Sequence, residues 1–128
     1  MTTPFWCLIV VMFIPLPLAF MGAAARTKAF GTADNKLPRL QVAKLDDQGA
    51  RVYGAQANAW EATIMFAVTI IVTHLAGLDP AAAAPWAIGF VVARVAHAAT
   101  YVLDIDKLRS GSFMVGLVCI IALLVKAA

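Results

Sequence analysis

The stretch RVYGAQANAWEATIMF, residues 51–66, joins an apolar helical pattern to a row of polar residues. From Trp60 onward it enters some of the most apolar sequence of the chain, yet it also carries Arg51, Asn58 and Glu61. Steps of seven and three residues are close to whole helical turns, so these three polar side chains fall along one side of a helix. Such a helix favours an arrangement in which its polar side faces protein and its other sides face lipid.

The composition of the chain excludes an ordinary soluble domain. Its 128 residues suit a single domain, residues 1–128, but 62% of them are hydrophobic and only 13% are charged. The mean hydropathy is +0.86, and a small soluble protein has too little interior to bury so much apolar surface. The net charge of +3 comes without a basic stripe, so we expect no nucleic-acid partner. The two cysteines, Cys7 and Cys119, are predicted to be free thiols, and no Cys/His cluster indicates a metal site.

Four segments are long and apolar enough to cross a membrane, which takes about 20 residues for a hydrocarbon layer of about 30 Å. The sequence therefore predicts an all-α, integral membrane four-helix bundle with spans at about 5–30, 50–78, 81–103 and 111–127. Pro15 and Pro17 are expected to bend or loosen the first span, because proline cannot donate a helical hydrogen bond.

The positions of the basic residues predict the orientation of the spans. The second connection carries only Asp79, whereas the third carries Lys107 and Arg109. The first connection and its edges carry the other loop cations: Arg26, Lys28, Lys36, Arg39, Lys44 and Arg51. Positive charge favours the cytoplasmic side, so we expect the first and third connections in the cytoplasm and both termini outside. The short tails and the lack of a targeting segment favour a bacterial inner membrane.

A second polar row lies on the third predicted span, where Arg94, His97 and Tyr101 follow helical spacing. The second and third spans are antiparallel, and counting from a turn centred at Asp79–Pro80 places Glu61 level with His97. The same count places Asn58 level with Tyr101.

Arg94 then lies one turn deeper, and its long side chain is expected to reach toward Glu61 and form an ion pair. Two interpretations of this polar cluster stay open: it holds the helices in register, or it forms a site. Because five polar groups converge at one depth, which exceeds what helix registration needs, we favour a site.

The same residues carry a family resemblance. The pattern has three parts: Arg51-x-x-x-Ala55-x-x-Asn58-x-x-Glu61, then Arg94-x-x-His97-x-x-x-Tyr101, then Leu108-Arg109-Ser110. This order and spacing resembles the MAPEG family, the membrane-associated proteins in eicosanoid and glutathione metabolism. The resemblance extends over nearly the whole chain, with four spans, a long first connection and RTKAF, residues 26–30, closing the first helix.

The resemblance implies a homotrimer with glutathione in a cytoplasm-facing cleft between subunits. It implies a transferase or peroxidase in which the glutathione thiolate attacks a lipophilic electrophile from the bilayer, so membrane lipids and hydrophobic small molecules are expected partners. By position, Asn58 and Glu61 would contact the peptide, with Glu61 on its amino group. The other implied binding residues are Arg51, Arg94, His97 and Tyr101. Arg109, with Ser110, would lie nearest the sulfur and stabilise the thiolate.

Three positions depart from the glutathione-using pattern. Gly54 stands where many members have arginine, Ala57 where some have another, and Gln56 where histidine is frequent. Each missing arginine removes charge-assisted hydrogen bonds worth about 1.5–3 kcal/mol. An alternative function therefore remains open: a non-catalytic membrane protein that binds lipid or scaffolds a partner and has lost the glutathione site.

Overall fold

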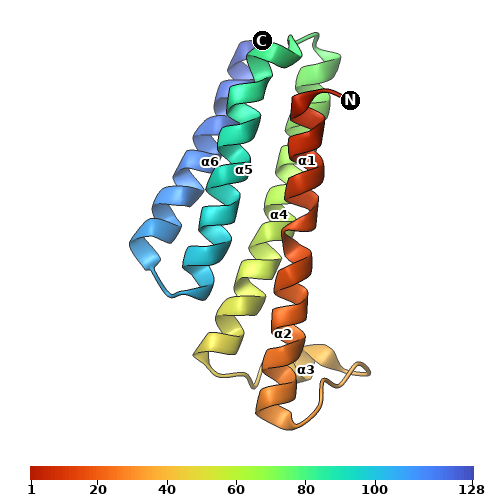
Figure 1. Ribbon diagram of the computed structural model, residues 1–128, viewed down its shortest axis with the longest axis vertical. Helices are drawn as coiled ribbons and strands as arrows, with labels where there is room; N and C mark the ends of the chain where they lie inside the picture. The colour runs from red at the N-terminus through yellow and green to blue at the C-terminus, as the bar shows by residue number, and fades with distance from the viewer.

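The computed structural model describes all 128 residues, and they form six helical segments. The helical segments are α1 (Thr3–Phe13), α2 (Pro15–Phe30), α3 (Pro38–Val42), α4 (Asp47–Leu75), α5 (Pro80–Val102) and α6 (Asp106–Ala127). With α1 and α2 taken as one span, four helices are long and apolar enough to cross a membrane. Both chain ends lie at the end of the bundle that carries the α4–α5 turn, and the first and third connections lie at the opposite end (Figure 1).

The first span is interrupted at Ile14, as the two prolines predict. The Ile14 amide donates to the Val11 carbonyl rather than to the residue four back, and Pro15 starts α2. Above this break α1 packs against both α4 and α5, whereas α2 packs against α4 and its backbone does not approach α5. The proline break therefore separates the lower half of the first span from α5.

Capping residues set the ends of α4. Asp46 accepts a hydrogen bond from the Gly49 amide at 2.8 Å, which caps the helix at its beginning. At the other end Gly77 adopts a left-handed φ of 84°, and α5 begins at Pro80 after its cap Asp79. The helix thus starts and ends about three residues before the span predicted at 50–78. The α6 helix begins at Asp106, earlier than the predicted 111.

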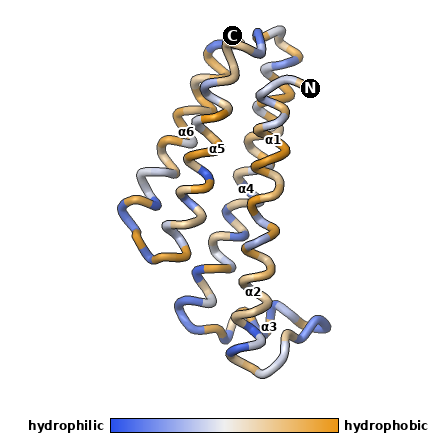
Figure 2. Tube along the Cα trace, viewed as in Figure 1, coloured by the Kyte–Doolittle hydropathy of each residue, from blue (hydrophilic) through white to orange (hydrophobic).

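The core lies in the half of the bundle near the chain ends. Phe66 of α4 stacks on Phe90 of α5 with ring centroids 4.2 Å apart, and Val11 and Leu123 are fully buried beside them. Both cysteines are free, as predicted, and lie in this cluster. At most 39% of any span is buried within the chain, so apolar side chains cover the outer surface, and hydrophilic residues concentrate toward the connections (Figure 2).

The first connection is held to the end of α2 by a buried arginine. Arg26 is 7% exposed, and its Nη1 donates to the Asp34 carbonyl at 2.7 Å and to Gln41 Oε1 at 3.5 Å. Gln41 in turn accepts from the Asp34 amide and donates to the Thr32 carbonyl. The short helix α3, which carries Gln41 and which the sequence does not predict, is thereby tied to the bundle.

Candidate functional site

Most of the predicted site residues line two adjoining cavities at the end of the bundle that carries the first and third connections. One cavity, of about 340 Å³, is lined by Asp47, Ala50, Arg51, Tyr101, Asp104 and Arg109. The other, of about 350 Å³, is lined by Asn58, His97, Tyr101, Arg109, Ser110, Phe113 and Met114. The two cavities share Tyr101 and Arg109, and we call them together the cleft. Arg94 lines neither cavity, but it contacts Asn58 and His97, which line the second one. Glu61 also lines neither cavity.

Arg94 is the most deeply buried cation of the site, with 4% of its surface exposed. Its Nη2 donates to the side-chain oxygen of Asn58 and, at 3.4 Å, to the Asn58 carbonyl. The same nitrogen lies 3.4 Å from His97 Nδ1, whereas Nε is buried without a partner. These contacts join α4 to α5 and fix the orientation of Asn58 and His97 at the cleft.

The predicted ion pair between Glu61 and Arg94 is absent. Glu61 is exposed on α4, and the only ion pair in the structure joins Arg51 to Asp104. The long Arg94 side chain does extend toward the first connection, as expected, but it continues past the level of Glu61 to Asn58. Within one chain Glu61 therefore makes no direct ion pair with the buried polar cluster.

The predicted register of the two polar rows is wrong by about one turn. Tyr101 lies against Gly54 rather than level with Asn58, and Asn58 lies at the level of Arg94 and His97. The cause is the turn: α4 ends at Leu75 and α5 begins at Pro80, so its midpoint lies between Gly77 and Leu78 rather than at Asp79–Pro80. Each residue of α5 therefore faces a residue of α4 about one turn earlier in the sequence than predicted.

The Tyr101 ring packs against Gly54, and the Arg109 guanidinium lies over the same ring. A Cβ atom at Gly54 would lie 2.6 Å from the Tyr101 hydroxyl oxygen and 2.9 Å from Cζ. The Arg109 guanidinium carbon lies 4.7 Å from the Tyr101 ring centroid, a cation–π contact. The His97 ring also packs edge-on against Tyr101, with ring centroids 5.7 Å apart. Gly54 thus permits the stack that positions Arg109.

Arg51 has a partner that sequence reasoning missed. Its Nη1 lies 3.3 Å from the Asp104 carboxylate, which follows α5 with a left-handed φ of 62°. Aspartate tolerates that conformation better than most residues do. The sequence signal is the DID stretch, residues 104–106, whose carboxylates look like ordinary caps until the end of α5 is known. The apolar lining residues Phe113 and Met114 were also missed, because they resemble lipid-facing positions of α6.

The cleft combines unpaired positive charge with a change from polar to apolar lining. Arg51 is neutralised by Asp104, but neither Arg94 nor Arg109 has a carboxylate within 4.0 Å. The lining is charged near Arg51, whereas Phe113 and Met114 line the far part. Arg109 lies where the two parts join, beside the Ser110 hydroxyl. This arrangement suits an anionic group that meets an apolar molecule.

Comparison with known proteins identifies the family. The model of the MAPEG family matches residues 3–128, nearly the whole chain. No curated protein and no solved structure matches it. Because the family match extends over the four apolar helices and the cleft, the chain is an integral membrane four-helix bundle that belongs to the MAPEG family.

Proposed function

We propose that this protein is a glutathione-dependent transferase or peroxidase that acts on lipophilic electrophiles. The observation that carries the proposal is the position of Arg109, which lies at the junction of the charged and apolar parts of the cleft. A cation there favours the thiolate form of a bound thiol, and the thiolate is the nucleophilic form. Many members of the family are glutathione-dependent enzymes.

The residues of the cleft fit the charges of glutathione, a tripeptide with two carboxylates. Arg94 is the buried cation without an acidic partner, and Asn58 and His97, which it orients, present polar atoms to the cleft. Arg51 and Tyr101 line the charged part and would hold a carboxylate or the peptide backbone. Arg109 and Ser110 would lie nearest the sulfur, facing an electrophile that enters along the apolar part lined by Phe113 and Met114.

Glu61 supports assembly into a homotrimer in this proposal. Its carboxylate is exposed on α4 although it lies within a predicted span, and an unpaired charge in hydrocarbon costs about 2.5–3.5 kcal/mol or more. A neighbouring subunit that covers this face removes the carboxylate from lipid. A glutathione molecule between the subunits then has Glu61 available for its amino group. The cationic loops favour a cytoplasmic cleft, and we place the protein in a bacterial inner membrane.

The test measures glutathione binding to the detergent-purified protein by calorimetry, with thiolate followed by ultraviolet absorbance. We expect saturable binding with a thiolate signal, and we expect Arg109→Ala to remove the thiolate signal while the oligomer persists. Lys107→Ala is the matched control, because Lys107 is an exposed cation two residues away that lines neither cavity. If Arg109→Ala leaves the thiolate signal intact, the role given to Arg109 is wrong.

A second candidate function is favoured by Gly54. Tyr101 occupies the space that a longer side chain at this position would need, and Ala57 offers no charge. A scaffold that binds lipid or a partner protein, without glutathione chemistry, needs no cation at either position. Absence of binding at millimolar glutathione would support this alternative, and lipids that copurify with the protein would then be identified.

A further inference from the structure

Below the break at Ile14, a groove lies between α2 and α5 and shares no lining residue with the cleft. Because α2 stays on α4 and its backbone does not approach α5 below the break, side chains of the two helices leave a cavity of about 370 Å³ between them. Its lining is apolar apart from backbone: Ile14, Pro17, Leu18, Met21, Val95, Ala98, Ala99, Val102 and Leu103. The site residues Arg94, His97 and Tyr101 lie on another side of α5.

The groove continues into a second cavity with a polar rim. This cavity, of about 440 Å³, shares Met21 and Val102 with the apolar one and extends between α2 and the beginning of α4. Its remaining lining residues are Ala24, Ala25, Lys28, Ala29, Asp46, Gln48, Gly49 and Val52. Both volumes fall within the range of about 300–1,000 Å³ that is usual for ligand sites. The combined groove is apolar at one end and polar at the other.

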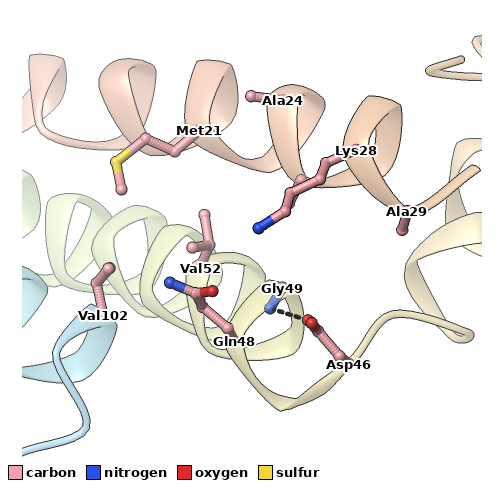
Figure 3. A pocket seen from close by; sticks show the side chains of 10 residues that line it. Met21, Ala24, Lys28, Ala29, Asp46, Gln48, Gly49, Val52 and Val102 are labelled. Atoms are coloured by element: carbon pink, nitrogen blue, oxygen red, sulfur yellow. Dashed lines mark hydrogen bonds between the residues drawn. The ribbon is translucent and has the colours of Figure 1, made fainter. Parts of the chain in front are cut away.

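Charge at the polar end favours an anionic ligand. The Lys28 ammonium group points across the cavity toward α4 (Figure 3) and has no carboxylate within 4.0 Å. The only acid of the lining, Asp46, directs a carboxylate oxygen to the Gly49 amide and caps α4 (Figure 3). The carboxylate thus serves the helix end, and the Gln48 amide side chain stands at the rim as a further polar group.

The length of the groove matches one leaflet of a bilayer. The first span runs from Thr3 to Phe30, so Pro17 lies near its middle. At 1.5 Å per residue, Lys28 lies roughly 16 Å beyond Pro17 along the helix. Half of a hydrocarbon layer of about 30 Å is about 15 Å. The apolar part therefore lies at the depth of acyl chains, and Lys28 lies at the depth of headgroups.

We propose that this groove binds an anionic phospholipid of the surrounding membrane, with one acyl chain between α2 and α5 and the phosphate at Lys28. Ala98 and Ala99 let the chain approach α5 closely, and the alanines of α2 do the same near the rim. The site is separate from the cleft, so the lipid is a bound component of the protein in either of the functions proposed above.

The test uses delipidated full-length protein in nanodiscs of phosphatidylglycerol mixed with an equal amount of phosphatidylcholine. Lipid that stays bound on release from the nanodisc is counted by native mass spectrometry. We expect about tenfold preferential retention of phosphatidylglycerol, because the choline cation of phosphatidylcholine offsets the phosphate charge that Lys28 would bind, and one charge-assisted interaction is worth about that factor. Lys28→Gln should abolish this preference, whereas Lys36→Gln, which removes an exposed loop lysine, should leave it unchanged.

A second pair of variants tests the acyl-chain part. Ala98→Trp should reduce retention of both lipids by filling the groove, and Val95→Trp, at a more exposed lining position, gives the same test with less risk to folding. Val118→Trp on the exposed face of α6 is the control. Equal retention of the two lipids by the unmodified protein, or variants at Lys28 and Val95 that behave like their controls, would overturn the proposal.

Discussion

Replacing Gly54 by alanine is expected to destabilise the protein, although alanine normally stabilises a helix. An added Cβ would lie 2.9 Å from Tyr101 Cζ, whereas carbon atoms in contact are about 3.5–4.0 Å apart, so the ring has to move by about 1 Å. Overpacking of this kind costs about 1–3 kcal/mol. The gain in helix propensity is about 0.5–1 kcal/mol, so the net expectation is a loss of up to about 2.5 kcal/mol.

The sign of the effect should reverse when the tyrosine ring is removed. In a Tyr101→Ala background, Gly54→Ala should stabilise by about 0.5–1 kcal/mol, which makes the coupling energy about 1–3 kcal/mol. The assay is unfolding in mixed micelles by added sodium dodecyl sulfate, followed by far-ultraviolet circular dichroism. Gly111→Ala is the control, because Gly111 lies in a helix with nothing within 4 Å of an added Cβ.

A Gly54→Ala variant as stabilised as the Gly111→Ala control would show that the tyrosine does not lie on the glycine. Stabilisation of Gly54→Ala would then also argue against the position of the Tyr101 ring on which Arg109 lies. A destabilised Gly54→Ala variant whose sign does not reverse in the Tyr101→Ala background would also contradict the reasoning, because the strain would then come from another neighbour.

Three further predictions use the same unfolding assay or a simple extension of it. Asn58→Leu should destabilise by about 1.5–3 kcal/mol, because it leaves the buried Arg94 without its side-chain acceptor; a loss below about 0.5 kcal/mol would mean that water replaces Asn58. Arg26→Met should speed proteolysis of the first connection, whereas the exposed Arg39→Met should not, and equal rates would exclude the anchoring role. Asp104→Asn should change stability by less than about 1 kcal/mol, since the Asp104 side chain is exposed, and a larger loss would indicate that the carboxylate is needed by the half-buried Arg51.

The helices of this protein follow from the sequence because hydrocarbon imposes the same requirement on every span. A segment of sufficient length and low charge satisfies its backbone only as a helix, and the four segments need no tertiary information to be found. Helix ends are different, because local side chains decide them. Asp46 begins α4 by capping Gly49, and Gly77 stops it by adopting a left-handed φ. Both residues can be read in the sequence, but each moves the end of α4 by only a few residues from the end of the predicted span.

That small shift decides which site residues face each other. Moving the midpoint of the α4–α5 turn by about two residues moves every facing pair by twice as much, which is about one helical turn. For this reason the sequence can group the polar residues of each helix into a row and still pair Asn58 with Tyr101 instead of placing Tyr101 on Gly54. Glycine has no side chain that a polar pattern could detect, so the contact between Gly54 and Tyr101 can be predicted only when the register of α4 and α5 is known.

The partner of Arg94 escaped prediction for a second reason, which is side-chain length. An arginine reaches more than one turn along its helix, so both Glu61 and Asn58 were within its range. Charge alone favours the carboxylate, yet Glu61 stands on the exposed side of α4, where a bond to Arg94 would draw both groups out of the bundle. Asn58 lies on the inner side and accepts the bond while Arg94 stays buried. Arg94 thus forms no direct ion pair with any acid of its own chain, and this arrangement favours an anion in the adjoining cleft more than a structural ion pair would.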